Sequence, residues 1–185
     1  YVLFSTLDGT YIEPQVDLFG APVVVPANPT RVGYTFSGWD SAIPATIGSA
    51  DVTLNAVWTP LSVAYTIVVW RENANDTNYS YATTVTGQTA LSGSTVNTFN
   101  TALVTDAEAG YFTYNYCNPI TVKGDGSSVQ NVYFSRNTYY ANFLLARNNA
   151  TLTANGATYT HSGDNSHVDY SFTAKYDSNI SNLWP

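Results

Sequence analysis

Hydrophobic and polar residues alternate in short runs along most of the chain. In the run Val52–Trp58 the apolar residues occupy every second position, and Thr53 and Asn55 lie between them. A period of two is typical of a strand with one buried face. Other runs share this alternation, or are rich in β-branched and aromatic residues, and also predict strands. They are Val2–Ser5, Ile12–Val16, Val23–Val25, Tyr34–Phe36, Ala64–Trp70, Tyr79–Val85, Tyr111–Tyr116, Val129–Ser135, Tyr139–Ala146, Thr151–Ala154, Ala157–Thr160 and Tyr170–Lys175.

Helical periodicity is almost missing from the sequence. Thr98–Ala109 is the one candidate helix, and its composition also suits a loop. Turn signals, in contrast, recur at Asp8-Gly9, Asp125-Gly126 and Asn155-Gly156, where a positive φ is tolerated and hairpins are favoured. The run Tyr65–Trp70 is apolar on both faces, which predicts a strand covered on two sides or lying against a neighbouring module. The fold class is therefore all-β to β-dominated α+β.

Two pairs of segments resemble each other within the chain. Gly33–Phe36 is similar to Gly110–Thr113, and Val52–Trp58 is similar to Val129–Phe134. Segments that recur in this way indicate small modules in tandem. The short junctions between these modules predict an elongated, stiff array. The expected modules are residues 1–60, residues 61–137, and an atypical or incomplete third module at residues 138–185.

Composition and charge exclude several partners. Charged residues make up 10% of the chain, and 6 Lys+Arg against 13 Asp+Glu give a net charge of -7. Such a chain repels phosphate backbones and anionic lipid, so neither nucleic acid nor a membrane surface is expected as a partner. No run of about 18 apolar residues predicts membrane insertion. Because methionine is absent, we expect the chain to be a segment of a larger protein. We also expect this segment to be monomeric.

The sequence offers little for catalysis, and we expect no catalytic residue, metal or cofactor. The two histidines are His161 and His167, and no G-x-S-x-G motif accompanies them. Their segment matches no zinc or EF-hand spacing, which favours a solvated loop over a metal site. Lys123 and Lys175 are the candidates for an intramolecular Lys–Asn isopeptide bond, but exposed charged lysines are the favoured interpretation.

Aromatic residues, at 15% of the chain, exceed what small modules readily bury. Alternation places Tyr79 with Tyr81 on one strand face, and Phe112, Tyr114 and Tyr116 together on another. Exposed tyrosine suits an interface. The candidate ligand-binding residues are therefore Tyr79, Tyr81, Tyr114 and Tyr116, with packing in the core or between modules as the alternative role for each.

The first module carries a specific motif. The segment Pro26–Trp39 (PANPTRVGYTFSGW) and the closing run Asp51–Trp58 (DVTLNAVW) closely resemble the internalin-type B-repeat, also called the Listeria-Bacteroides repeat. The resemblance covers about residues 1–60, with Asp8 in place of the usual first glycine and Asn55 in place of a tyrosine. Fold maintenance is the favoured role for the motif residues, which are Pro29, Arg31, Gly33, Tyr34, Phe36, Gly38, Trp39 and Trp58.

The middle segment is similar to tyrosine-rich modules of Gram-positive surface proteins and to mucin-binding-protein repeats. The resemblance lies in Ala64–Trp70, Ile120–Ser127 and Asn131–Asn137. Both resemblances imply β-grasp-like modules, a cell-wall-anchored or secreted bacterial protein, and a non-enzymatic stalk or adhesive role. One alternative is a module that binds a host glycan, mucin or immunoglobulin-like protein. Another is an accessory carbohydrate-binding segment of a secreted enzyme.

Overall fold

The computed structural model describes residues 1–164 and 166–185 of the chain. Strands hold 46% of the residues and helix 3%, and no helix of seven or more residues occurs in the described part. The β-dominated fold class is thereby confirmed. The two helical elements are single 3₁₀ turns.

The chain divides into two compact units, each assembled from separate segments. The division passes through the middle of the expected second module, so the three-module organisation stays a prediction. The first unit contains Tyr1–Ile67, Thr86–Thr98 and Pro119–Gln130, and the second contains Val68–Val85, Phe99–Asn118 and Asn131–Pro185.

The first unit begins with a three-stranded sheet in the order β1-β3-β2. β1 (Val2–Ser5) pairs in parallel with β3 (Val52–Pro60), and β2 (Tyr34–Trp39) pairs antiparallel with β3. The alternation in β3 is realised, because its apolar positions Leu54 and Ala56 are buried. The core of this sheet consists of Val2, Phe4, Ile47 and Leu54, with Ile12, Ala21, Val23, Trp39, Ile43 and Val52 packed against it.

Two predicted strands do not form in this unit. Ile12–Val16 makes a single bridge, between Gln15 and Val2, and a further bridge joins Pro22 to Thr46 just before the expected strand at Val23–Val25. Pro22 lacks the N–H that a continuous ladder requires. The hairpin expected at Asp8-Gly9 is reduced to the antiparallel bridge between Val2 and Gln15, because β1 takes the distant β3 as the partner for its full length.

The motif aromatics of the first unit pack against one another. Phe36 lies edge-on to both Trp39 and Trp58, with ring centroids 5.2 and 5.5 Å apart. Trp58 Nε1 donates a hydrogen bond to the Thr6 carbonyl at 2.8 Å. Arg31 lies 4.1 Å above the Tyr34 ring, and its guanidinium pairs with the Asp8 carboxylate at 3.3 Å.

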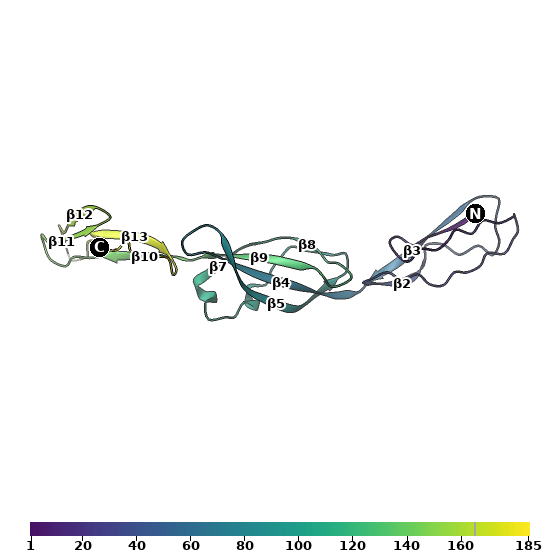
Figure 1. Ribbon diagram of the computed structural model, residues 1–185, viewed down its shortest axis with the longest axis horizontal. Coiled ribbons are helices and arrows are strands. Elements are labelled where there is room, and N and C mark those ends of the chain that lie inside the picture. Colours follow the sequence, from purple (N-terminus) through teal and green to yellow (C-terminus); the bar gives the residue numbers. More distant parts are fainter. Residues whose placement is uncertain (165) are drawn as a thin grey trace. The chain divides into compact units, whose positions relative to one another are not determined.

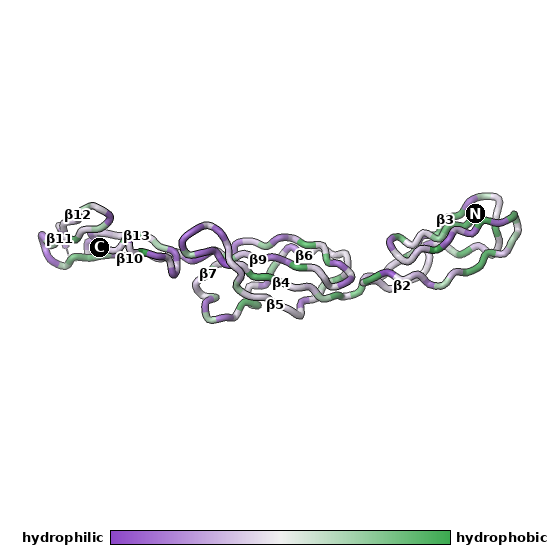
Figure 2. Tube along the Cα trace, viewed as in Figure 1, coloured by the Kyte–Doolittle hydropathy of each residue, from purple (hydrophilic) through white to green (hydrophobic). Residues whose placement is uncertain are grey.

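A four-stranded sheet in the order β5-β4-β9-β7 forms the middle of the chain (Figure 1). Its strands are β5 (Tyr79–Leu91), β4 (Ser62–Glu72), β9 (Val129–Arg136) and β7 (Phe112–Cys117). Two short strands, β6 (Thr95–Val96) and β8 (Ile120–Thr121), pair separately. β4 takes an inner position, as its apolar sequence predicts, and Figure 2 shows the hydrophilic loop that connects it to β5.

One face of this sheet is buried within the second unit. Val69, Val132 and Phe134 are buried there, and Phe99 lies edge-on to Phe134 at 6.0 Å. The candidate helix at Thr98–Ala109 does not form, and the loop that the composition also suited is found there, interrupted by short 3₁₀ turns. Asn100 caps the 3₁₀ turn η1 (Thr101–Leu103) by accepting the Ala102 N–H, and a second turn, η2, follows at Ala109–Tyr111.

The described residues after Arg136 form two antiparallel strand pairs. β10 (Thr138–Phe143) pairs with β13 (Tyr170–Lys175), and β11 (Thr151–Ala154) pairs with β12 (Ala157–Thr160). The turn at Asn155-Gly156 has positive φ at both residues, 47° and 75°, which confirms the predicted hairpin. Aromatic rings form the packing here: Phe143, Tyr159, Tyr170, Phe172 and Trp184.

Candidate binding face and the joint beside it

The other face of the four-stranded sheet carries a continuous row of aromatic rings. Tyr81 of β5 lies edge-on to Trp70 of β4, with ring centroids 6.4 Å apart. Trp70 is stacked parallel to Tyr133 of β9 at 6.5 Å, and Tyr133 is stacked on Tyr116 of β7 at 4.5 Å. Tyr79 stands edge-on to Tyr133 at 5.1 Å. We call these five residues the aromatic face, to which every strand of the sheet contributes at least one ring.

Strand alternation and one irregularity produce this row. Trp70 alternates with the buried Val69, and Tyr133 alternates with the buried Val132 and Phe134. In β7 the register shifts between Tyr114 and Tyr116, so that Tyr114 pairs with Phe134 and Tyr116 with Tyr133. This β-bulge turns two tyrosines of the same parity toward opposite faces.

The candidate tyrosines therefore separate. Tyr79, Tyr81 and Tyr116 lie on the aromatic face, whereas Tyr114 packs against Phe99 and Phe134 on the buried face. The expectation that Phe112, Tyr114 and Tyr116 share one face is wrong, because a bulge cannot be read from alternation. Trp70 and Tyr133 were not among the candidates. The sequence gives no phase for Trp70, because its run is apolar on both faces, and only the burial of Val69, Val132 and Phe134 places Trp70 and Tyr133 on the opposite face.

Neutral polar groups lie between the rings. Trp70 Nε1 donates to Asn131 Oδ1 at 2.8 Å, and Asn115 Nδ2 donates to the Tyr79 hydroxyl at 3.1 Å. The Tyr81 hydroxyl is 3.0 Å from the Thr84 hydroxyl. Each of these bonds fixes the orientation of a ring and leaves further donors and acceptors on the same side chains.

Exposure is greatest at the two ends of the row. Tyr81 is 59% exposed and Tyr116 is 43% exposed, and they belong to the two edge strands. Trp70, Tyr79 and Tyr133 are half-buried between them. Burial, reinforced by the Tyr133 and Tyr79 phenols, raises the pKa of Tyr116 above its ordinary value of 10.0. The Tyr116 phenol therefore stays neutral at physiological pH.

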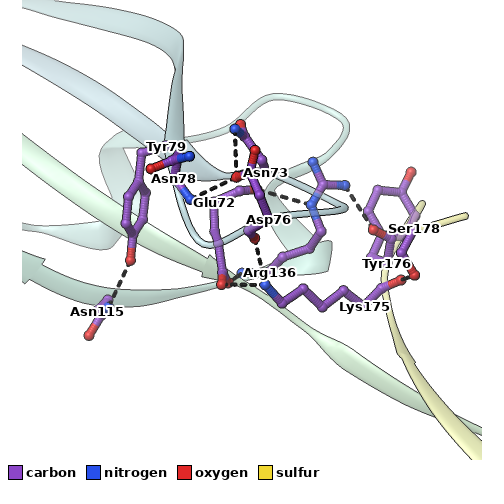
Figure 3. A network of polar contacts seen from close by, with 10 residues as sticks. All are labelled: Glu72, Asn73, Asp76, Asn78, Tyr79, Asn115, Arg136, Lys175, Tyr176 and Ser178. Carbon is purple, nitrogen blue, oxygen red and sulfur yellow. Dashed lines mark hydrogen bonds and ion pairs between the residues drawn. The ribbon is translucent and has the colours of Figure 1, made fainter.

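A charged joint lies beside the aromatic face, where β4 ends and β13 ends (Figure 3). Lys175 Nζ contacts Glu72 Oε1 at 2.6 Å and donates to the Asp76 carbonyl at 3.0 Å. The backbone N–H of Arg136 donates to Glu72 Oε2 at 3.0 Å. The Arg136 side chain bonds the carbonyl of Glu72 through Nε and that of Tyr176 through Nη1. The joint thus ties strands β4, β9 and β13 together.

Electrostatics and ring stacking both support this joint. Burial alone raises the pKa of Glu72, but the hydrogen bonds from Lys175 and from the Arg136 N–H outweigh burial and lower it below 4.5. Tyr111 and Tyr176 stack in parallel with ring centroids 4.0 Å apart. The Arg136 guanidinium lies 4.8 Å above the Phe112 ring. Charge pairing and aromatic contact therefore act at the same place.

The loop between β4 and β5 links the joint to the aromatic face. Asp76 Oδ1 accepts hydrogen bonds from Asn73 Nδ2 and from the Asn78 N–H, and the latter bond lowers the pKa of Asp76 most. Figure 3 shows this loop beside Lys175, with Tyr79 following it and bonded to Asn115. The loop therefore connects Glu72 of the charged joint to Tyr79 of the aromatic face.

A second joint, made of backbone contacts, lies in the first unit. The Leu61 N–H donates to the Gly33 carbonyl at 2.9 Å, and the Ser92 N–H donates to the Leu61 carbonyl at 2.9 Å. Gly33 has φ 80°, and a Cβ at this position would clash with the backbone of Gly124. The glycine of the motif is therefore required by close backbone approach as well as by its φ angle.

The histidine segment differs from the expected solvated loop. His161 is 1% exposed, and its Nδ1 lies 2.9 and 3.0 Å from the two carboxylate oxygens of Asp169. Asp169 also accepts the Leu145 N–H at 2.7 Å. In residues 1–164 and 166–185 no group of three or more His, Cys, Asp or Glu side chains is placed to hold a metal ion. Asn165, in the same segment, lies outside the described residues.

Comparison with protein-family models and with curated proteins finds no match for this chain. Within the described residues, no helix is long and apolar enough to cross a membrane.

Proposed function

We propose that the chain is a non-enzymatic adhesive segment of an extracellular bacterial protein, anchored to the cell wall or secreted, and that its aromatic face contacts the ligand. In this proposal the chain consists of tandem β-grasp-like modules. The B-repeat resemblance of residues 1–60 supports the assignment to a bacterial surface protein. The partner is a host glycan or a host surface or secreted protein.

The aromatic row carries this proposal. Five rings from four strands are held in mutual contact on one sheet face, and the end rings Tyr81 and Tyr116 remain open to solvent. Tyrosine and tryptophan present large contact area with few rotatable bonds, so little conformational entropy is lost when a ligand binds. Rings needed only for stability would be expected on the buried face, with Phe112 and Phe134.

The test is binding to immobilised mucin and other host glycoproteins, measured by biolayer interferometry. We expect the double variant Tyr81→Ala/Tyr116→Ala to lose most of the binding. Tyr140→Ala is the matched control, because Tyr140 is 79% exposed and belongs to β10, which is not a strand of the four-stranded sheet. Circular dichroism and thermal unfolding establish that each variant is folded. Equal binding by the wild type and the double variant contradicts the proposal.

A spacer role is the second candidate, and the two joints favour it. Both joints combine several contacts within a short stretch of chain, which restricts bending at each junction. A pure spacer predicts binding to no host glycoprotein, together with hydrogen-exchange protection at Leu61 and Arg136 as high as in the sheet interiors. Rapid exchange at these two amides speaks against a stiff junction.

A further inference from the structure

We propose that the aromatic face binds a neutral, linear oligosaccharide that lies across the strands, from Tyr81 on one edge strand to Tyr116 on the other. This inference rests on the ligand-binding role proposed above and names the chemical class of the ligand. Its basis is the arrangement of the rings, the polar groups between them and the absence of charge within the row.

The row has the dimensions of an extended ligand. It crosses four strands, and three inter-strand spacings place its ends about 14 Å apart. The rings are neighbours along this whole line, with no centroid separation above 6.5 Å. A single sugar ring covers only part of this length. A chain of several pyranose rings covers it fully, so affinity should grow with the number of sugars until both ends are reached.

The chemistry of the row matches the two sides of a sugar. A pyranose presents C–H groups on its faces and hydroxyls around its rim. Tyr81 and Tyr116 are the exposed rings of the row, and the face of Tyr116 that is turned away from its stacking partner Tyr133 suits a C–H face. Between them, Asn131 uses Oδ1 for Trp70, which leaves its Nδ2 as a donor, and Asn115 uses Nδ2 for Tyr79, which leaves its Oδ1 as an acceptor. These groups suit the hydroxyl rim.

Charge selects a neutral glycan over an anionic one. The five rings and the two asparagines carry no charge, and Lys175, the cation beside them, is already paired with Glu72. The chain as a whole has a net charge of -7. A sialylated or sulfated chain would meet this excess of negative charge without an unpaired cation among the rings and asparagines of the aromatic face, and its association would be slowed and weakened.

The face is also ordered before the ligand arrives. Trp70 and Tyr79 are each held by a hydrogen bond and by ring contacts on neighbouring strands. Binding therefore costs little side-chain entropy. This arrangement favours recognition of a flexible chain by a rigid platform, in which each sugar adds a modest contribution.

The experiment titrates the full chain with neutral oligosaccharides of two to six sugars from glucose, N-acetylglucosamine and galactose series. Isothermal titration calorimetry and NMR chemical-shift mapping follow binding. For at least one series we expect affinity to rise at least about tenfold from the disaccharide to the longest chain, with shifts confined to the aromatic face. Tyr81→Ala and Tyr116→Ala should each remove most of that gain, and Tyr140→Ala should not.

A second arm separates this inference from the proposed function. Host glycoprotein that binds through the aromatic face is treated with glycosidases and measured again. Loss of binding supports the inference. If the wild type binds the deglycosylated protein as well as before, and the Tyr81→Ala/Tyr116→Ala variant does not bind it, the inference is overturned. The adhesive role then stands, with a protein as the partner. Preference for sialylated or sulfated chains over their neutral forms also overturns it. Failure of every glycoprotein to bind contradicts both proposals.

Discussion

Tyr116 stacks on Tyr133 with ring centroids 4.5 Å apart and an interplanar angle of 17°, whereas Tyr114, two residues earlier in the same strand, packs on the opposite face of the sheet. The register shift between Tyr114 and Tyr116 separates them. Without the bulge, Tyr116 would point into the core and the aromatic row would end at β9. One inserted residue therefore extends the row to the edge strand.

The position of a ring in the row should decide how much it stabilises the fold. Tyr133 is half-buried and contacts Trp70, Tyr79 and Tyr116, so Tyr133→Ala should lower the free energy of unfolding by roughly 2 kcal/mol. Tyr81→Ala, at a largely exposed ring, should cost less than about 1 kcal/mol. Urea unfolding monitored by tryptophan fluorescence measures both. Equal costs would contradict this account of the row.

The sheet faces were predictable from the sequence only where alternation is uninterrupted. In β3 the pattern gives the correct phase, and the buried Leu54 and Ala56 follow from it. In β7 the phase changes at the bulge, which depends on pairing with β9 and leaves no mark in a single sequence. The local pattern therefore predicts which residues share a face within one strand. The register between two strands can be assigned only when the pairing strand is known.

The charged joint could not be predicted from the sequence, for a different reason. Glu72 and Lys175 are 103 residues apart and belong to no motif, so nothing local indicates that they meet. The Asn155-Gly156 hairpin, in contrast, was predictable because its requirement for positive φ is local. Chemistry that depends on the close approach of distant segments becomes visible only in the fold.

Gly33 should tolerate substitution less well than another glycine with a similar backbone. Gly33 and Gly20 have φ of 80° and 84°, so an alanine at either position pays a backbone cost of about 1 kcal/mol. A Cβ at Gly20 meets nothing within 4 Å, whereas at Gly33 it clashes with Gly124 and contacts Ser92.

We therefore expect Gly33→Ala to lose about 1–2 kcal/mol more than Gly20→Ala in urea unfolding. Hydrogen exchange adds a local measurement, because the Leu61 N–H donates to the Gly33 carbonyl. Its protection should fall in Gly33→Ala and stay unchanged in Gly20→Ala. Similar stability and protection in the two variants would mean that close backbone approach at Gly33 is not limiting.

The Glu72–Lys175 pair should show measurable coupling. Both side chains are partly shielded, with 15% and 29% of their surface exposed, and their contact is 2.6 Å. A double-mutant cycle with Glu72→Gln, Lys175→Met and the double variant should give a coupling energy of about 1 kcal/mol, above that of a typical exposed pair. Arg71 and Asp106, paired at 2.7 Å, provide a comparison cycle. A coupling energy near zero would leave ring stacking and the Arg136 contacts as the main support of the joint.

Acid should weaken the same joint in a defined pH range. The pKa of Glu72 is lowered in the folded protein: burial raises it, and the hydrogen bonds from Lys175 and the Arg136 N–H more than offset that effect. The unfolded chain therefore takes up the Glu72 proton first as the pH falls. The stabilisation is complete above the ordinary pKa of 4.5 and is lost as the pH falls through the lower folded value.

Other lowered carboxylates, such as Asp106 and Asp169, contribute to acid unfolding in the same direction, so the Glu72 share must be isolated by difference. Urea unfolding at a series of pH values from 7 to 3 should show a smaller loss of stability for Glu72→Gln than for the wild type. Lys175→Met should also reduce the slope, because it removes one of the two hydrogen bonds that lower the pKa of Glu72. Parallel stability curves for the wild type and Glu72→Gln below pH 4.5 would show that Glu72 is not held ionised by this joint.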